Sequence, residues 1–164
     1  MLLIFVNREE IFEAARRRKE STQVEMEYQQ LLRFCLDKDW YGISIENVVE
    51  VIKCPKIFNV PYTPDYVVGV INLRGEILAV IEIKRILGLP ATDSDNKKFV
   101  VVIERGKTRF GILVDRASDV VSIPNSTLES PLSDDDSADN LIAGEAQLQG
   151  ALLAILNPDK LLEV

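Results

Sequence analysis

The sequence predicts an all-β protein built from two small β-barrels, with a helix near each end of the chain. Three observations support this fold class. The 164 residues are 47% hydrophobic and 27% charged, as is usual for a globular protein. Two segments of the chain are repeated, and short strand-like runs alternate with glycine-marked bends. Closure into barrels removes the exposed edges that many short strands would otherwise leave.

The internal repeat has two parts, which occur in the same order in both copies. Residues 41–55 align without gaps with residues 110–124, and residues 69–79 align with residues 144–154. A copy of about 65 residues buries only about 60% of its unfolded surface, so the two copies are expected to pack together. The identical positions are Gly42, Ile43, Val51, Pro55, Gly69, Leu73, Gly75, Leu78 and Ala79, which recur as Gly111, Ile112, Val120, Pro124, Gly144, Leu148, Gly150, Leu153 and Ala154.

The first predicted element is a helix over residues 8–20, within an N-terminal extension of residues 1–27. Asn7 is a suitable cap, and Glu10 follows it at the spacing of a capping box. Ile11, Phe12, Ala14 and Ala15 form a short apolar stripe. The repeat contains no counterpart of this helix, so we expect it to lie outside both barrels as an appendage.

The remaining elements are mostly strands. "LLRFCL" and "WYGISI" flank the polar "DKD", and "FVVVIE" and "TRFGILV" flank "RGK", which predicts two hairpins. "EILAVIEI" and "ALLAIL" are further strands, and "KRILGLP" is a helical turn ended by Gly88 and Pro90. "PDKLLEV" is a final helix with Pro158 in its first turn. "SDDDSADN" is interpreted as a polar loop, because its carboxylates lack a metal-ligand spacing.

Composition argues against several classes of function. The net charge of −7 argues against a non-specific nucleic-acid or anionic-membrane surface. The chain has no histidine, which excludes histidine bases and histidine metal ligands. Its two cysteines stand singly, and no apolar run approaches the roughly 20 residues that a membrane helix needs. We expect neither a cofactor nor direct membrane insertion.

Four stretches of this chain resemble the CheW-type chemotaxis coupling proteins: "YGISIENVVEVI", "VPYTPDYVVGVINLRGEILAVIEI", "RFGILVDRASDVVSIP" and "LLAILNPDKLL". The resemblance covers roughly residues 30–162. It implies two intertwined SH3-like five-stranded barrels without catalysis. It also implies a cytoplasmic scaffold that joins transmembrane chemoreceptors to the histidine kinase CheA in receptor arrays. The expected CheW-like domain spans residues 28–164, with subdomains at about 28–95 and 96–157 and a C-terminal helix at 158–164.

The resemblance also implies two binding sites. Arg74 is the most distinctive candidate, because it recurs only as Gln149 and the barrel fold therefore does not require it. The resemblance places Glu50, which recurs as Asp119, beside Arg74 as an ion-pair partner. The expected receptor-binding residues are Val48, Glu50, Gly69, Leu73, Arg74 and Gly75. The expected kinase-binding residues lie on the second barrel and are Val100, Val101, Val102, Gly111 and Asp115.

Several alternatives stay open from the sequence. The glycines have a sufficient explanation as bends, and Val48 is explained equally well as core. For the kinase-side hairpin, core packing is the stronger explanation, because alternating apolar residues in a hairpin are usually buried. The N-terminal helix is longer than the family needs, which is compatible with a paralogue that serves another two-component system, such as surface or pilus-based motility. The other classes are a double barrel that binds a small ligand and an enzyme built on carboxylates and lysines.

Overall fold

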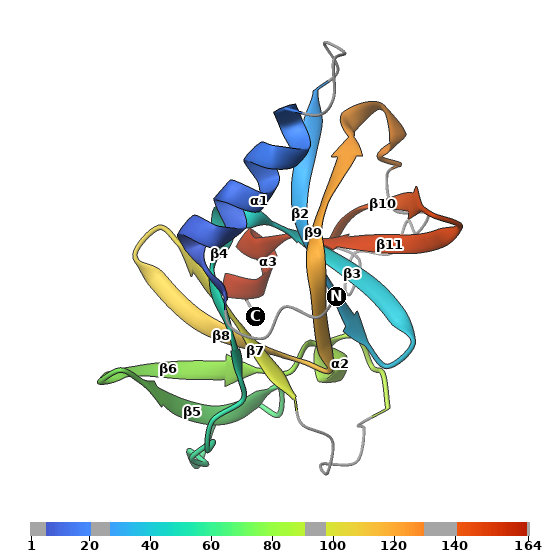
Figure 1. Cartoon of the computed structure of the whole chain (residues 1–164). Helices are drawn as coiled ribbons and strands as arrows, with labels where there is room; N and C mark the ends of the chain where they lie inside the picture. The colour runs from blue at the N-terminus through green and yellow to red at the C-terminus, as the bar shows by residue number, and fades with distance from the viewer. Residues whose placement is uncertain (1–5, 21–26, 91–97, 130–140, 164) are drawn as a thin grey trace.

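The computed structural model describes residues 6–20, 27–90, 98–129 and 141–163 (Figure 1). Strands make up most of this part of the chain. The predicted polar loop at residues 131–140 lies outside the described residues. The elements in chain order are β1 (Val6–Asn7), α1 (Arg8–Glu20), β2 (Tyr28–Leu36), β3 (Asp39–Ser44), η1 (Ile45–Asn47), β4 (Val48–Lys53), β5 (Val67–Leu73), β6 (Glu76–Ile81), α2 (Ile83–Ile86), β7 (Phe99–Arg105), β8 (Thr108–Val114), β9 (Arg116–Pro124), η2 (Asn125–Thr127), β10 (Ile142–Leu148), β11 (Ala151–Leu156) and α3 (Pro158–Leu162).

The two copies of the repeat exchange their first hairpins. One sheet has the order β1-β4-β7-β8-β6-β5, and the other has the order β10-β11-β3-β2-β9. The first copy supplies β2 to β6 and the second supplies β7 to β11, so each sheet joins three strands of one copy to a hairpin of the other. We call the first sheet the first barrel and the second sheet the second barrel. The predicted all-β fold with two intertwined five-stranded units is confirmed, and β1 adds a short sixth strand to the first.

One backbone bridge joins the two edges of each sheet. Beyond β4, Phe58 pairs with Val70 of β5 through N–O distances of 2.8 and 2.9 Å. Beyond β9, Glu129 pairs with Glu145 of β10 at 2.9 Å in both directions. Because β4 and β5 belong to opposite sides of the first sheet, and β9 and β10 to opposite sides of the second, these bridges close each sheet into a barrel.

Equivalent residues of the repeat occupy equivalent structural positions. The turn residues Arg74 and Gly75 have φ of 49° and 87°, and their counterparts Gln149 and Gly150 have φ of 52° and 78°. Positive φ at both central residues is the geometry of the type I′ hairpin turn. In β5 the register shifts between Val67 and Gly69, and β10 shifts at the corresponding place. The duplication inferred from the sequence therefore extends to turns and bulges.

The core lies in three clusters. The largest fills the junction between the barrels and includes Phe34, Ile43, Ile103 and Ile112. A second cluster fills the first barrel, and a third, around Leu31, fills the second barrel. The two barrels therefore share most of their buried apolar surface and form one packed body.

The N-terminal helix forms over the predicted residues. The Asn7 side chain accepts a hydrogen bond from the backbone N–H of Glu10 at 2.9 Å, and the Glu10 carboxylate accepts one from the Asn7 N–H at 3.4 Å. This reciprocal pair is the predicted capping box. The expectation that the helix is an appendage is wrong, because Ile11 and Ala15 are buried in the junction cluster. Phe12 and Ala14 of the predicted stripe point to solvent.

One short helix follows the last strand of each copy, α2 after β6 and α3 after β11. α2 ends before Gly88, whose φ is 68°, and α3 begins at Pro158 with Asn157 as its cap. Both match the predicted helical turns. Among the helices of the described residues, none is long and apolar enough to cross a membrane.

Candidate partner-binding surface

Arg74 stands at the tip of the hairpin that joins β5 to β6. The Asn72 side chain accepts a hydrogen bond from the Gly75 N–H at 2.9 Å, which fixes the turn. The Arg74 guanidinium donates to the carboxylate of Glu50 on β4, which lies on the other side of the bridge that closes the first barrel. The side chain of Arg74 is 72% exposed, whereas that of Glu50 is 10% exposed. The carboxylate therefore holds the arginine from below while most of the guanidinium stays in solvent.

A shallow hollow of about 370 Å³ lies around this ion pair. It brings together three of the predicted receptor-binding residues, Glu50, Leu73 and Arg74, with Gly75 beside them in the turn. We call these four residues the Arg74 surface. Residues at the start of α1 line the same hollow, which the sequence did not indicate. The full lining is Asn7, Glu10, Glu50, Ile52, Lys53, Pro55, Asn72, Leu73 and Arg74.

Two other predicted receptor-binding residues are buried and present no side chain at the surface. Val48 packs in the junction cluster. Gly69 has φ of 149°, and a Cβ there would lie 2.3 Å from the carbonyl oxygen of Phe58. Its role in this structure is to let the closing bridge of the first barrel form.

The expected kinase-binding hairpin lies in a different barrel than predicted, and its apolar residues are core. Val100, Val101 and Val102 are fully buried, and a Cβ on Gly111 would lie 2.5 Å from Val100. β7 and β8 also belong to the first barrel, where Val102 is the cross-strand partner of Glu50. The expected location on the second barrel is therefore wrong, because the copies exchange their first hairpins.

Salt bridges connect the exposed end of this hairpin to the Arg74 turn. Arg109 of β8 donates to Glu76, next to Gly75, at 2.8 Å, and also to Glu104 of β7. The hydrogen bond from Arg109 is the main reason that the pKa of Glu104 is lowered. The apolar side chain of Ile77 stands beside this charged strip and is 61% exposed. Its repeat counterpart Leu152 is 55% exposed, so the offset of 75 residues could have revealed this pair.

Asp115, the last predicted kinase-binding residue, belongs to a buried ion-pair network. The ammonium of Lys84 in α2 lies 2.6 Å from Asp115 and 3.0 Å from Asp37 in the β2–β3 turn. The Lys84 side chain is only 2% exposed. Burial by itself would lower the pKa of Lys84, but the hydrogen bonds to Asp115 and Asp37 and their negative charge outweigh it, so the pKa is raised. We call these three residues the Lys84 triad.

The second copy carries a charge-reversed version of the Lys84 triad. Asp159 of α3 occupies the position of Lys84 and accepts two hydrogen bonds from Arg105 in the β7–β8 hairpin, at 2.7 and 3.0 Å. In each copy the terminal helix thus anchors a hairpin turn. No sequence signal marked Lys84, because a lysine in a short helix is ordinarily exposed.

The second barrel uses its own acidic residue differently. Asp119, the counterpart of Glu50, accepts a hydrogen bond from Arg33 of β2 at 2.9 Å. The Arg33 guanidinium also lies 4.8 Å from the centre of the Trp40 ring, on which Arg116 stacks at 5.5 Å. These arginines therefore rest on the sheet instead of extending from a turn.

Among the described residues, neither the acidic groups nor the Cys54 thiol forms a site suited to metal binding or nucleophilic chemistry. No group of three acidic, cysteine or histidine side chains in residues 6–20, 27–90, 98–129 and 141–163 is placed to hold a metal ion. Burial raises the pKa of Cys54, although Lys98 partly opposes this, and a raised pKa makes a thiol a poor nucleophile at neutral pH.

Comparison with known proteins identifies the family to which this fold belongs. The family model described as the CheW-like domain matches residues 30–164. The chain belongs to the CheW family. Its matches include the chemotaxis protein CheW of Thermotoga maritima, at 31% identity over 82% of this chain and 87% of that protein. The CheW protein of Helicobacter pylori is 28% identical over 82% of this chain and 81% of that protein.

A solved structure shows the same CheW fold. The crystal structure of the scaffolding protein TtCheW from Thermoanaerobacter tengcongensis superposes with a TM-score of 0.73 and 27% identity. The superposition covers 80% of this chain and 90% of that one. The CheW-like domain of the present chain begins after α1, so residues 6–20 lie outside the part that the family model matches.

Proposed function

We propose that this CheW-family protein is a non-enzymatic cytoplasmic scaffold that couples transmembrane chemoreceptors to a CheA-type histidine kinase in receptor arrays. One observation carries the proposal. Arg74 is held by Glu50 on an exposed turn of the first barrel, whereas the equivalent turn of the second barrel has Gln149. The barrel fold is built twice with this turn and needs the arginine in neither copy.

The Arg74 surface has the chemistry of a protein-binding site. The guanidinium of Arg74 is 72% exposed, and solvent screening limits what its ion pair with Glu50 adds to folding, so stability alone is a weak reason for the pair. A guanidinium held in one orientation offers a rigid fork of donors to carboxylates or carbonyl oxygens of a partner helix. The exposed apolar side chain of Ile77 on the same hairpin adds an apolar contact beside the charge.

We assign the receptor to the Arg74 surface and the kinase to the β7–β8 hairpin. The buried residues Val100 to Val102 and Gly111 would act by positioning this hairpin, and Asp115 by anchoring its base to Lys84. The contact itself would fall on the exposed end, where Glu104 and Arg109 lie. Because both sites belong to the first barrel, one barrel would contact both partners.

The test is Arg74→Ala in a ternary binding assay. The partners are a chemoreceptor cytoplasmic-tip fragment and the kinase C-terminal domain from the same genome. Truncation of an arginine that is an interface hot spot costs about 2 kcal/mol or more of binding free energy, which is a loss of roughly 30-fold in affinity. The free energy of unfolding should fall by only about 1–2 kcal/mol, because the guanidinium is mostly exposed but its removal leaves the buried Glu50 carboxylate without its partner.

Gln149→Ala is the matched control, because it changes the same turn position at nearly the same φ in the other barrel. It should leave receptor binding unchanged. Normal assembly of Arg74→Ala, or an equal loss in Gln149→Ala, would reject the proposed role of the Arg74 surface. Failure of the wild-type protein to bind either partner would reject the scaffold function as a whole.

A further inference from the structure

Residues 6–20 reach the Arg74 surface although they lie outside the CheW-like domain. Strand β1 pairs with the edge of β4, and Asn7 is the cross-strand partner of Glu50. Asn7 and Glu10 line the same hollow as Glu50 and Arg74. A partner that approaches Arg74 across β4 therefore meets β1 and the first turn of α1.

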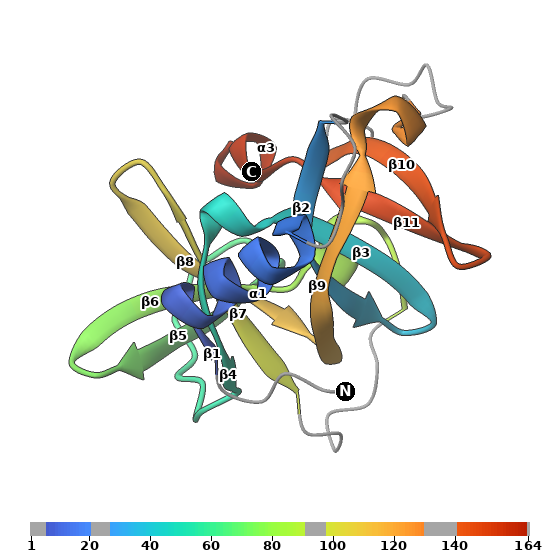
Figure 2. The same ribbon diagram turned by 45° about the horizontal axis from the view of Figure 1, so that its top comes forward.

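From this point α1 spans the two barrels. It contacts β4 of the first barrel and β9 of the second, and Figure 2 shows it crossing between the sheets. Ile11 and Ala15, four residues apart on one helical face, are buried in the junction cluster. The chain thus shows directly what this position accepts, which is an α-helix with small or branched apolar residues at that spacing.

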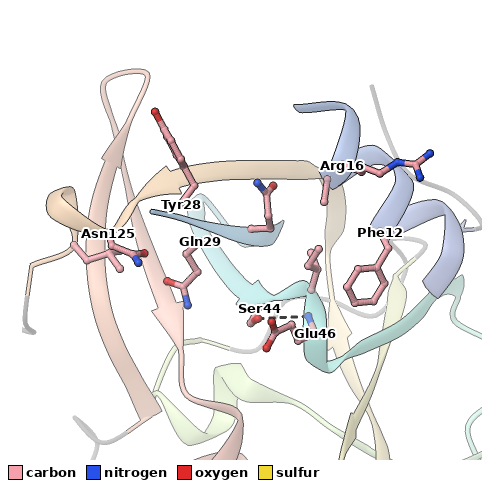
Figure 3. A pocket seen from close by; sticks show the side chains of 11 residues that line it. Phe12, Arg16, Tyr28, Gln29, Ser44, Glu46 and Asn125 are labelled. Atoms are coloured by element: carbon pink, nitrogen blue, oxygen red, sulfur yellow. Dashed lines mark hydrogen bonds between the residues drawn. The ribbon is translucent and has the colours of Figure 1, made fainter. Parts of the chain in front are cut away.

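The helix fills its position incompletely. Phe12 is exposed on the flank of α1. A hollow of about 650 Å³ remains between α1 and the second barrel, with Phe12 and Arg16 on one side and Tyr28 and Asn125 on the other (Figure 3). Of residues 8–17, the part of α1 whose burial the structure describes, only Ile11 and Ala15 are buried, so few of the described apolar contacts oppose release of the helix.

We infer that residues 6–20 are an internal competitor for the Arg74 surface, and that a helical partner must displace them to bind. This inference rests on the proposed function and adds a regulatory element to the same site. The measured affinity for the partner then equals the intrinsic affinity multiplied by the fraction of molecules in which α1 is released.

A reversible disulfide tests the inference directly. Val6 and Val51 are cross-strand partners in an antiparallel pair, whose Cα separation suits a disulfide. We would make Val6→Cys and Val51→Cys in a Cys54→Ser background and measure binding of a chemoreceptor-tip fragment before and after reduction. The oxidised protein should bind at least about tenfold more weakly than the same protein after reduction, because α1 can no longer leave.

A second variant changes the occupancy in the opposite direction. Ile11→Ala removes the larger buried side chain of α1 and should strengthen binding of the receptor tip by about threefold or more. Glu13→Ala is the matched control, since Glu13 lies on the exposed face of the same helix. It should leave the affinity unchanged. Thermal melts would verify that the barrels of each variant remain folded.

The outcomes separate this inference from the function on which it rests. Equal or tighter binding by the oxidised protein overturns the competition, as does weaker binding by Ile11→Ala. If either occurs while Arg74→Ala still weakens binding as predicted, the receptor site stands and the competition alone fails. If the reduced and wild-type proteins do not bind the receptor tip, both proposals fall.

Discussion

Each barrel has an acidic residue at the equivalent position, but its arginine partner is exposed in the first barrel and partly buried in the second. Glu50 of the first barrel pairs with Arg74, which comes from a hairpin tip and is 72% exposed. Asp119 of the second barrel pairs with Arg33, which comes from the adjacent strand β2 and is 20% exposed. Arg33 also lies against Trp40, whereas Arg74 has only its carboxylate partner among the hydrogen bonds of its side chain in the described residues.

This difference separates what the fold requires from what a partner can use. Both copies keep the turn with two positive φ values and an acid on the strand across the closing bridge, which is β4 or β9. Only the first copy places a guanidinium on the turn. A cation laid across a sheet contributes to packing, while one held at a tip gains little for the fold and remains available to another molecule.

The largest predicted contrast between the two halves lies in their helix anchors. Lys84→Met should lower the free energy of unfolding by about 3–5 kcal/mol, because it leaves two carboxylates facing each other without their buried cation. Asp159→Asn, at the equivalent position, should cost less than about 1 kcal/mol, since its pair with Arg105 is exposed.

Urea denaturation of both variants measures this contrast. Adding Asp115→Asn to Lys84→Met should recover part of the loss, because it removes one of the two facing charges. Equal losses in Lys84→Met and Asp159→Asn would show that burial does not distinguish the two anchors.

The second largest contrast is expected between the two bulge glycines, Gly69 and Gly144, in the stability lost when each is replaced by alanine. Gly69→Ala places a Cβ 2.3 Å from the Phe58 carbonyl at φ of 149°, whereas Gly144→Ala places one 3.1 Å from the Glu129 carbonyl. We expect a loss of about 2–3 kcal/mol at Gly69 and of about 1 kcal/mol at Gly144. Thermal unfolding of the two variants provides the comparison, and a reversed order would mean that the first barrel relaxes more easily than its bridge suggests.

The smallest predicted contrast in stability is that between Arg33→Ala and Arg74→Ala. Arg33→Ala removes a partly buried ion pair and the contact with Trp40, and should cost about 1–2 kcal/mol of folding stability. It should leave binding of the receptor tip intact, whereas Arg74→Ala should weaken that binding. Denaturation curves and binding isotherms of the two variants measure both quantities. Loss of binding in Arg33→Ala with unchanged stability would contradict the assignment.

Much of the fold could be read from local patterns. The hairpins around "DKD" and "RGK", the capping box of Asn7 and Glu10, and the duplicated turn at Arg74 all depend on residues close in sequence. The sequence did not show which strands of the copies pair with each other. Exchanged and unexchanged hairpins satisfy the same alternation, so the β7–β8 hairpin was expected in the wrong barrel.

The sequence predicted the ion pair of the candidate site but not which of the other proposed residues are exposed. Arg74 emerged because its repeat counterpart differs, and Glu50 was placed beside it by family resemblance. Val100 to Val102 could not be sorted by periodicity, because both faces of β7 are buried, one inside the barrel and one at the junction. Lys84 and Ile77 were missed, since each departs from the usual exposure of its residue type.

The exchange of hairpins has a consequence for how the protein is made. As the chain leaves the ribosome, β2 and β3 emerge early, but their partners β9 and β11 are near the end of the described chain. The first half of the nascent protein therefore carries unpaired strand edges until synthesis is almost complete. Such edges are where chains associate wrongly, and pairing across long sequence separations is slow. The same intertwining that joins the two barrels thus exposes the protein to misassembly during its synthesis. The need for chaperones should be greatest in the interval before β9 appears.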